Sequence, residues 1–549
     1  MISTNRLPFR IGPVSKWLIA ALVVMLLLGI PIYTVIAGLF KGPGANWEHL
    51  QKFLLPDYVK NSLLLVFGTG LLTLFWGLPT AWLVSTTQFP GRRLLEWLLI
   101  MPLSIPTYIM AFTYAGIFDY TGFIQTSLRK AFGLKVLHLD ILNLYGVMVI
   151  MSLALFPYVY VIARTAFLTR FRSLIEASQT LGASVTQSFF KVILPVARPA
   201  LVAGLTLVSM EVLNDYGAVT YYGVTTFTTG IFHSWFSLED IQAAIYLSAT
   251  LLMTVFIILL LEKYFRGQER FYNPVLAERP LKKNRLTGSS KWMAFLCCLL
   301  PVFLGFILPL FQLAVWCLSS FADVSHIDFI TTIFNSFTLA FGASAVCTAV
   351  SLLLLFVSRL QRNRVYDGLM KLSTMGYAIP GAVVAIGVLV PFLLVDKNII
   401  SLFRQLNLTT PGLVLTGTVF GLLFAFTVRF LSVAFNPVES GFEKVARSMD
   451  EAAATLGVGN WRRLMNINLP LLKGALGTAL LLVFVDILKE LPLTLILRPF
   501  NFNTLATRSF ELASDEQMAA AAVPSLVIIL VGMVPVYILN TILIKRKSP

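Results

Sequence analysis

A polar segment that occurs twice limits what this chain can fold into. The first copy covers residues 176–182 (EASQTLG) and the second covers residues 451–457 (EAAATLG). In each copy a Leu-Pro pair follows, with the proline thirteen residues after the glycine. The offset between the copies is 275 residues (451 − 176), about half of the 549-residue chain. Repetition at this period indicates two copies of one structural unit.

The composition indicates that lipid surrounds most of the chain. Hydrophobic residues make up 57% of the sequence and charged residues only 12%, whereas soluble domains carry about 25% charged residues. The four cysteines, at positions 297, 298, 317 and 347, lie in or beside apolar runs and show no metal-ligand spacing. We expect them to be buried packing thiols.

Long apolar runs predict an all-α polytopic membrane protein. A spanning helix needs about 20 mostly apolar residues. Twelve such runs occur, over residues 17–40, 61–85, 94–117, 142–166, 200–222, 241–261, 292–318, 333–357, 369–395, 413–434, 475–497 and 519–544. The first run is longer than the apolar centre of a signal peptide, so we expect it to be retained.

The positions of the basic residues predict the orientation in the membrane. With the N-terminus inside, the cytoplasmic segments hold 31 of the 42 Lys and Arg residues and the outside loops hold ten. The cytoplasmic count includes Arg164, Lys371 and Arg429, which are placed at the inner ends of spans. This bias predicts that both termini and both repeated segments are cytoplasmic. The net charge of +16 is therefore a topology signal, and no nucleic-acid partner is expected.

Further matches extend the repeat through both halves. The pair Asn61-Ser62 matches Asn335-Ser336, and Ile105-Pro106 matches Ile379-Pro380. Six spans in each half is an even number, so the halves run in the same direction and a pseudo-two-fold axis lies along the membrane normal. We predict a first domain over 1–262 with its loop at about 170–198, and a second over 292–549 with its loop at about 441–474. The basic linker, 263–291, is expected to be a solvated cytoplasmic tether.

Each repeated segment is expected to form a short helix outside the membrane. Alanines and a glutamate favour a helix start, and Gly182 and Gly457 can end the helix by adopting a positive φ. The Leu-Pro pair is expected to reset the chain before the next span. A helix held by turns at both ends can transmit force.

The second segment, with Ile467-Asn468-Leu469-Pro470 after it, resembles the EAA loop of binding-protein-dependent ABC importer permeases. The first copy departs only mildly, with Ser178 and Val192 at two motif positions. The resemblance implies two fused, parallel six-helix permease repeats of the type I importer class in a bacterial inner membrane. In that family the short helix sits in a cleft of a cytoplasmic ATPase subunit. The implied ATPase contacts are Glu176, Ala177, Gly182, Glu451, Ala452, Ala453 and Gly457.

The resemblance also implies the partners and the substrate class. Two ATPase subunits would carry the ATP and Mg²⁺, a periplasmic binding protein would deliver the substrate, and this chain would bind no cofactor. The fused length and the stretches 211–217 and 486–492 are most similar to ferric-iron permeases. Fused thiamine and aminoethylphosphonate permeases are close alternatives.

Charged residues inside the fifth and eleventh apolar runs form the second candidate site. Each costs about 2.5–3.5 kcal/mol on insertion scales. The candidates for a translocation path are Glu211, Asn214, Asp215, Asp486, Lys489 and Glu490. Lys489 can pair with Asp486 three residues earlier, or across the axis with Asp215 or Glu211. A polar seam that lines the path and a purely structural ion-pair cluster both fit this pattern.

No catalytic residue or metal site is expected from the sequence. The chain has no Gly-Lys dipeptide for a phosphate loop and no His-Glu-x-x-His motif. A transport subunit without its own enzyme chemistry is therefore the leading interpretation. The alternatives are a proton-coupled secondary transporter that uses the intramembrane acids and, more distantly, a membrane enzyme or channel.

Overall fold

The computed structural model describes residues 16–132, 140–169, 178, 180–182, 184–266, 283–320, 326–360, 364–410 and 412–545. Helices make up nearly all of this part of the chain, which confirms the all-α prediction. Its strands are β1 (Thr87–Gln88) and β2 (Asn284–Arg285), two residues each.

The helices of the first half follow the predicted runs with several breaks. They are α1 (Lys16–Gly38), η1 (Leu39–Lys41), α2 (Trp47–His49), η2 (Leu50–Leu54), α3 (Leu55–Thr86), α4 (Arg92–Leu98), η3 (Met101–Ser104), α5 (Thr107–Phe118), α6 (Phe123–Phe132), α7 (Leu144–Thr169), α9 (Val185–Ser188), η4 (Phe189–Ile193), α10 (Leu194–Asn214), α11 (Gly217–Tyr221), α12 (Phe227–Phe232), η5 (His233–Ser237) and α13 (Ile241–Arg266).

The second half repeats this order. Its helices are α14 (Ser289–Val302), η6 (Phe303–Ile307), α15 (Leu308–Ser320), α16 (His326–Leu360), α17 (Arg364–Ser373), η7 (Thr374–Ala378), α18 (Gly381–Gln405), α19 (Val419–Lys444), α20 (Arg447–Thr455), α21 (Asn460–Arg463), η8 (Leu464–Asn468), α22 (Leu469–Leu488), α23 (Pro492–Leu497), α24 (Leu505–Ser514) and α25 (Met518–Lys545).

Eleven helices in the described part of the chain are long and apolar enough to span a membrane, and a bent pair brings the number to twelve. The bent pair is the third predicted run, whose parts Arg92–Ser104 and Thr107–Phe118 meet at 95°. The ninth run is also split, between η7 and α18. Both breaks lie at the repeated Ile-Pro pair. The isoleucine has extended backbone dihedrals there, because a residue before proline is driven out of the helical region. The third and ninth predicted runs therefore each contain a break.

The fifth and eleventh runs also end earlier than the sequence predicts. Helix α10 ends at Asn214 and α22 ends at Leu488. After each helix the chain turns and forms a short separate helix, α11 or α23. The charged residues of these runs consequently lie at helix ends, where side chains can bond to free backbone groups.

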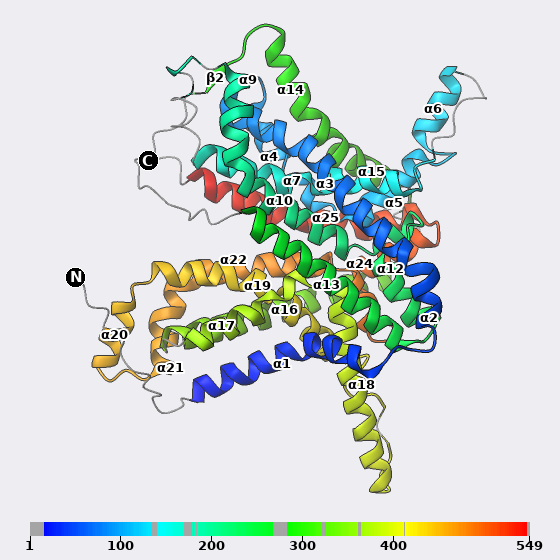
Figure 1. Cartoon of the computed structure of the whole chain (residues 1–549), viewed down its shortest axis with the longest axis vertical. Coiled ribbons are helices and arrows are strands. Elements are labelled where there is room, and N and C mark those ends of the chain that lie inside the picture. The colour runs from blue at the N-terminus through cyan, green and yellow to red at the C-terminus, as the bar shows by residue number, and fades with distance from the viewer. Residues whose placement is uncertain are drawn as a thin grey trace.

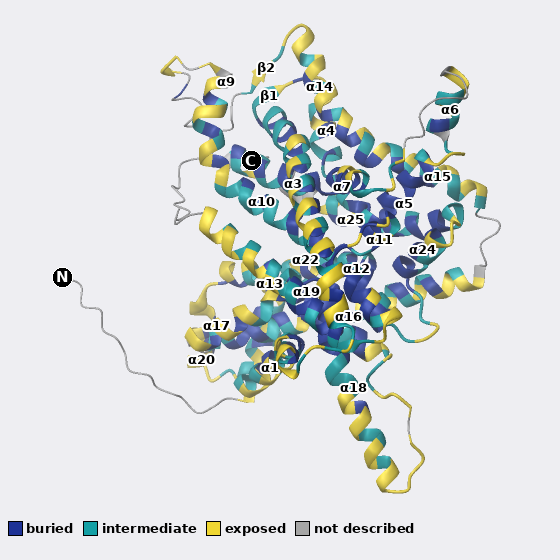
Figure 2. Cartoon of the chain, turned by 45° about the vertical axis from the view of Figure 1, so that its right-hand side comes forward, coloured by how far each residue is buried: buried dark blue, intermediate teal, exposed yellow. Residues whose placement is uncertain are grey.

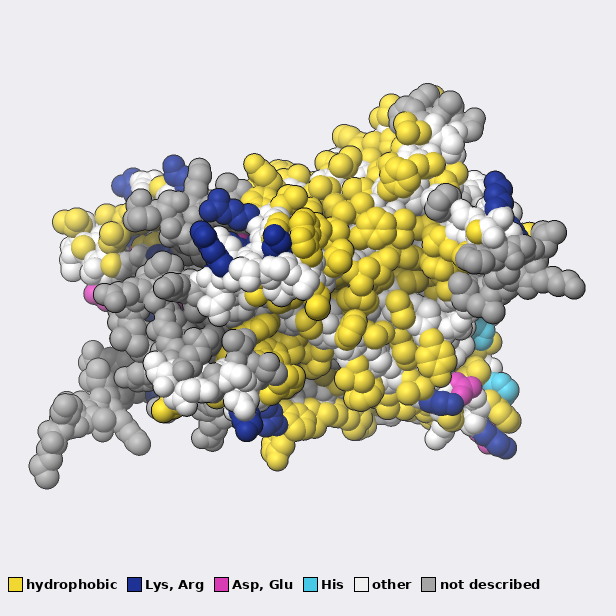
Figure 3. Space-filling view, turned by 90° about the horizontal axis from the view of Figure 1, so that it is seen from above, with side chains coloured by type: hydrophobic (Ala, Val, Ile, Leu, Met, Phe, Trp, Pro, Cys, Tyr) yellow, Lys and Arg dark blue, Asp and Glu magenta, His cyan; other side chains and the backbone are white. Residues whose placement is uncertain are grey.

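The spanning helices run from side to side in Figure 1, and the two ends of the molecule differ. The elements β2, α9, α20 and α21 lie at the left end, where α1 begins and α25 ends. Helices α2 and α6 and the projecting end of α18 lie at the right. A wide belt of hydrophobic side chains crosses the middle of the face shown in Figure 3, with charged side chains toward the ends. This is the surface that a membrane-spanning bundle requires.

The two halves interlock in space. One group of buried residues joins α1 and α13 to α16, α18, α19 and α22. The other joins α14, α15, α24 and α25 to α3, α5, α7 and α10. Figure 2 shows the buried residues concentrated inside these two groups. Contacts between helices of different halves are close, since a Cβ at Gly387 of α18 would lie 2.6 Å from the Pro31 carbonyl oxygen of α1.

The end of the linker is attached to the first half. Strand β2 pairs in parallel with β1, with Thr87 opposite Asn284 and Gln88 opposite Arg285. The Leu286 N–H also donates to the Gln88 carbonyl oxygen at 3.2 Å. This pairing holds the chain where it enters α14. The domain boundaries themselves stay a prediction, and residues 267–282 of the linker lie outside the described residues.

Candidate functional site

A polar cavity of about 90 Å³ lies where helices of both halves meet. We refer to it as the interlobe cavity. It is lined by the start of α5, by α7, η7 and α19, and by the ends of α10 and α22. All six residues predicted for the translocation path line it: Glu211, Asn214, Asp215, Asp486, Lys489 and Glu490. The structure therefore brings the candidate path residues of both halves together, while their role in transport stays a prediction.

Two of the carboxylates also hold short helices in place. Asp215 accepts hydrogen bonds from the N–H groups of Ala218 (2.8 Å) and Val219 (3.3 Å), and from the Thr107 hydroxyl. In the second half, Glu490 accepts one from the Leu493 N–H at 3.3 Å. The first N–H groups of a helix lack partners within it, so these acids stabilise the starts of α11 and α23.

The cavity contains two ion pairs in the described structure. Lys489 Nζ lies 2.8 Å from Asp486 Oδ1, which is the local pairing among the alternatives considered from the sequence. Arg429 of α19 lies 3.4 Å from Glu490 Oε1, and its side chain is only 6% exposed. It also donates to Asn214 Oδ1 at 2.8 Å.

The assignment of Arg429 to the inner end of a span is wrong. The apolar run at 413–434 suggested a helix that ends near this arginine, but α19 covers Val419–Lys444 and places it near the middle. Arg429 is thus a buried cation within a membrane-spanning helix, and such residues usually mark functional sites. The signal in the sequence was the ten further residues, 435–444, that could extend the helix beyond the apolar run.

Three hydrogen bonds join the first half to the second across the cavity. Tyr377 of η7 donates to Glu211 Oε1 at 2.9 Å. The Gly381 N–H at the start of α18 donates to Asn214 Oδ1 at 2.7 Å, and Arg429 donates to the same oxygen. We call these bonds the interlobe clasp. Sequence reasoning missed Tyr377 and Arg429, because an aromatic or a single cation gives no spacing signal until the partner helix is known.

The cavity lining holds more carboxyl groups than cations. Its lining includes four carboxylates, from Glu211, Asp215, Asp486 and Glu490, and two cations, from Arg429 and Lys489. With all groups ionised the formal charge is −2 (2 − 4). Within the described residues no three His, Cys, Asp or Glu side chains form a set suited to a metal ion. The arrangement suits weak attraction of a cation more than tight coordination.

The second repeated segment forms α20 at the left end of the molecule in Figure 1, beyond the apolar belt. Glu451 and Ala452 are exposed, and Ala453 is buried. The Val458 N–H donates to the Ala453 carbonyl oxygen and the Gly457 N–H to that of Ala454, at 2.9 and 3.0 Å. These two hydrogen bonds form a Schellman motif, which needs a residue with left-handed backbone dihedrals directly after the helix.

The two motif glycines adopt the predicted conformation. Gly182 has φ +82° and Gly457 has φ +74°, which confirms the prediction of a positive φ at these positions. Glu176 and Ala177 of the first copy lie outside the described residues. The feature that can be compared is thus the positive φ of the motif glycine, and both halves share it.

The predicted reset at the Leu-Pro pair is wrong. Helices α21, η8 and α22 form one continuous segment, Asn460–Leu488, with Pro470 inside it. A π-helical turn comes directly before each Leu-Pro pair, as η4 in the first half and η8 in the second. In η8 the Leu469 N–H bonds to the Leu464 carbonyl oxygen, five residues back. This wider turn accommodates a proline that would otherwise break the helix.

One pair of exposed residues was missed by sequence reasoning. Leu181 and Leu456, each directly before a motif glycine, are 87% and 81% exposed. Trp461 at the start of α21 is 60% exposed. The signal was available, because leucine precedes the glycine in both copies.

These features define a class of protein: a duplicated, all-α membrane protein with a polar cavity where its halves meet and a short helix beyond its apolar belt. The family model for "binding-protein-dependent transport system inner membrane component" matches residues 73–263 and 351–549. The chain belongs to this family, and it is a permease subunit of an ABC importer.

Three relatives show how far the similarity extends. The chain is 26% identical to the Fe(3+)-transport system permease protein FbpB 2 of Haemophilus influenzae, over 94% of this chain and 97% of the relative. It is 24% identical to the putative ferric transport system permease protein FbpB 1 of the same organism, over 86% and 76%. It is 33% identical to the sulfate transport system permease protein CysT of Escherichia coli, over 36% of this chain and 71% of the relative.

Proposed function

We propose that this permease passes ferric iron, delivered by a periplasmic binding protein, through the interlobe cavity. The observation that carries the proposal is the excess of carboxylates over cations in that cavity. A negative cavity within low-dielectric walls attracts cations and repels anions. The relatives that match most of the chain are named as ferric permeases.

The alternative substrates differ in charge. Sulfate, which the half-length relatives are named for, and aminoethylphosphonate both carry negative groups that four carboxylates would repel. Thiamine is a cation and fits the cavity charge, so it is the second candidate. A proton-coupled secondary transporter receives no support, because the family takes its driving force from partner subunits.

Transport itself requires the lobes to separate and close around the path. We propose that two ATPase subunits bind at the repeated segments, with Leu181 and Leu456 as apolar contacts beside the predicted EAA-loop residues. ATP and Mg²⁺ would reside on those subunits. Movement of the short helices would then open the interlobe clasp, whose bonds between Glu211 and Tyr377 and at Asn214 join the two halves.

The substrate proposal is tested by uptake. The complete transporter in proteoliposomes, supplied with its binding protein, should accumulate radiolabelled ferric iron when ATP is present. Replacing Glu211 with Gln should reduce this uptake, while the chain remains in the vesicles at the natural level. Uptake of thiamine in place of iron under the same conditions would show that the substrate assignment is wrong.

We also propose that the end of the molecule with α20 and β2 faces the cytoplasm, as the basic-residue bias indicates. Reporter fusions at Gly44, Ser237 and Asp323 should then report the outside, and fusions at Thr287 and Pro549 the inside. The structure supports a common side for Gly44 and Ser237, since a Cβ at Gly44 would meet the carboxylate of Asp240, three residues after Ser237. One reversed pair of reporters would overturn the orientation.

A further inference from the structure

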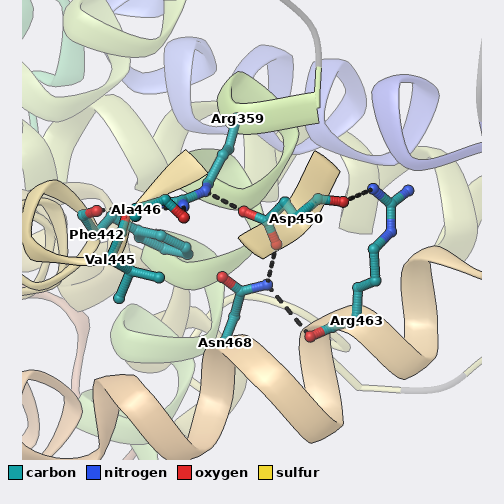
Figure 4. Close-up of polar contacts among 7 residues, drawn as sticks. All are labelled: Arg359, Phe442, Val445, Ala446, Asp450, Arg463 and Asn468. Carbon is teal, nitrogen blue, oxygen red and sulfur yellow. Dashed lines mark hydrogen bonds and ion pairs between the residues drawn. The ribbon is translucent and has the colours of Figure 1, made fainter. Parts of the chain in front are cut away.

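We propose that Arg359 and Asp450 are positioning residues that fix the second coupling helix, α20, to the transmembrane bundle. This inference rests on the proposed role of α20 in binding the ATPase. Figure 4 shows the contacts that carry it. Arg359, at the end of α16, pairs through Nε with the carboxylate of Asp450 in the first turn of α20. The two side chains are 7% and 12% exposed.

The same arginine binds the end of a third helix. Its other two nitrogens donate to the carbonyl oxygens of Phe442 (3.0 Å), Val445 (2.8 Å) and Ala446 (3.0 Å), at and just beyond the end of α19. The last carbonyl groups of a helix lack partners within it and carry partial negative charge, so a buried guanidinium there is doubly favourable. Arg359 therefore joins α16, α19 and α20 at one point.

Asp450 uses its second oxygen to reach the next span. Its Oδ1 accepts from Asn468 Nδ2 at 3.0 Å, and Asn468 also donates to the Arg463 carbonyl oxygen at 3.2 Å. Asn468 is fully buried in the π-turn η8, directly before α22. The Arg463 side chain returns to the Asp450 carbonyl oxygen at 3.3 Å. The start of α20 and the entry to α22 thus belong to one hydrogen-bond network.

This network connects the coupling helix to the interlobe cavity. Helix α19 carries Phe442 at the network and Arg429 in the cavity, thirteen residues apart (442 − 429), which is about 20 Å along a helix. Helix α16 packs beside it, with Ser351 bonded to the Leu431 carbonyl oxygen. A displacement of α20 would therefore move the element that carries Arg429, and with it the Arg429–Asn214 bond of the clasp.

The positions of the first half that correspond to this network carry no charged residue. Through the repeat offsets of 274 and 275 residues, Arg359, Asp450 and Asn468 correspond to Ser85, Ile175 and Ile193. Ile193 is fully buried, and Ile175 lies outside the described residues. In the described part of the first half, Glu96 pairs with Arg164 and joins α4 to α7. The network at the start of α20 is thus built from residues that the first half does not repeat.

The test compares Asp450→Asn with a matched control in the complete transporter in proteoliposomes. Uptake of radiolabelled ferric iron and ATP hydrolysis are measured in the same vesicles. Asp450→Asn should lower the iron imported per ATP hydrolysed about tenfold, a change typical of a lost coupling contact. The control is Asp367→Asn, because Asp367 bonds Ser358 beside Arg359 at 2.7 Å but does not reach α20. Asp367→Asn should import nearly as much iron per ATP hydrolysed as the unaltered transporter.

A second variant and a second measurement guard against misfolding. Arg359→Lys keeps the charge but cannot bond three carbonyl groups and a carboxylate together, so it should lower the same ratio. In both variants the amide hydrogens of α20 should exchange about tenfold faster, measured by mass spectrometry. The inference is overturned if Asp450→Asn leaves both the amide exchange of α20 and the iron imported per ATP hydrolysed at the values of the unaltered transporter.

The outcome also separates this inference from the proposed function. If Glu451→Lys leaves transport intact, α20 is not a coupling helix and the proposed function fails at that point. The other outcome is that Glu451→Lys abolishes transport while Asp450→Asn and Arg359→Lys leave both the iron imported per ATP and the amide exchange of α20 unchanged. In that case only the positioning role of Arg359 and Asp450 is wrong.

Discussion

At the scale of single residues, the buried charges show how a membrane-spanning bundle accommodates ions. Arg429 lies between Glu490 and Asn214, and Lys489 lies against Asp486. Asp215 bonds to backbone N–H groups at a helix start. Each charge therefore has a partner, because an isolated charge in a low-dielectric interior is very costly. These contacts form the structural cluster considered from the sequence, while the role of the same residues in lining a path stays a prediction.

Removing Arg429 should destabilise the chain because it leaves Glu490 buried without its cation. We expect Arg429→Ala to cost about 3–5 kcal/mol, as breaking a buried pair does. The double variant Arg429→Ala/Glu490→Gln should recover part of the loss, because the unpaired carboxylate is gone. Thermal unfolding in detergent measures both effects.

The control for this prediction is Arg498→Ala. Arg498 pairs with Glu511, but the two side chains are 24% and 30% exposed, so its loss should cost about 0–1 kcal/mol. Strictly additive effects of Arg429→Ala and Glu490→Gln would contradict the coupling between the two residues.

At the scale of elements, turns and breaks decide where the functional residues lie. The Ile-Pro pairs at 105–106 and 379–380 break their helices, whereas the Leu-Pro pairs at 194–195 and 469–470 do not. The difference lies in the preceding turn: the Leu-Pro pairs follow a π-turn that has already changed the hydrogen-bond register. Each motif glycine has a positive φ, and the leucine directly before it is exposed.

Gly457→Val should impair transport while the chain still reaches normal abundance. A Cβ at Gly457 meets nothing within 4 Å, so the cost is the left-handed backbone alone, about 1–2 kcal/mol. That cost is small for this fold, but relief of the strain would re-aim α20, and a docking surface is sensitive to shifts of about an ångström. Uptake should approach zero with weaker ATPase association, and Glu176→Lys or Glu451→Lys should act similarly.

Gly459→Val is the matched control for this prediction. Gly459 lies two residues further along, also has open space for a Cβ, and has φ −63°. It should keep most of its transport. Natural transport in a chain with valine at both 182 and 457 would mean that these turns do not serve coupling.

At the scale of the whole molecule, the two halves exchange helices. Helices α1 and α13 pack in the group that holds most of the second half, and α14 and α15 pack with the first. Neither half can then bury its apolar surface alone. The pairing of β1 with β2 holds the crossing point between them.

Each half expressed alone should therefore accumulate poorly, because its exchanged helices lack their partners. A chain cut between residues 267 and 282 but co-expressed as two pieces should assemble and co-purify, since the packing is retained across the cut. Immunoblots of membranes from the single-half, two-piece and intact strains measure this. A first half that accumulates alone at the level of the intact chain would contradict the exchange.

The sequence by itself determined the class of the protein. Apolar runs, repeat spacing and basic-residue bias are local or periodic signals, and the membrane makes them decisive, because only helices satisfy their backbone groups in lipid. The same signals located the six cavity residues Glu211, Asn214, Asp215, Asp486, Lys489 and Glu490 and the two positive-φ glycines.

The tertiary structure alone decided which residues meet. Tyr377 and Arg429 enter the cavity, and Arg359 reaches Asp450, across gaps of roughly 90 to 215 residues in the chain. No spacing rule encodes such contacts, because a partner across a helix interface depends on the rotation and depth of both helices. The exchange of α1 and α14 between the halves could not be predicted for the same reason, because the sequence of an apolar helix does not specify which other apolar helix it packs against.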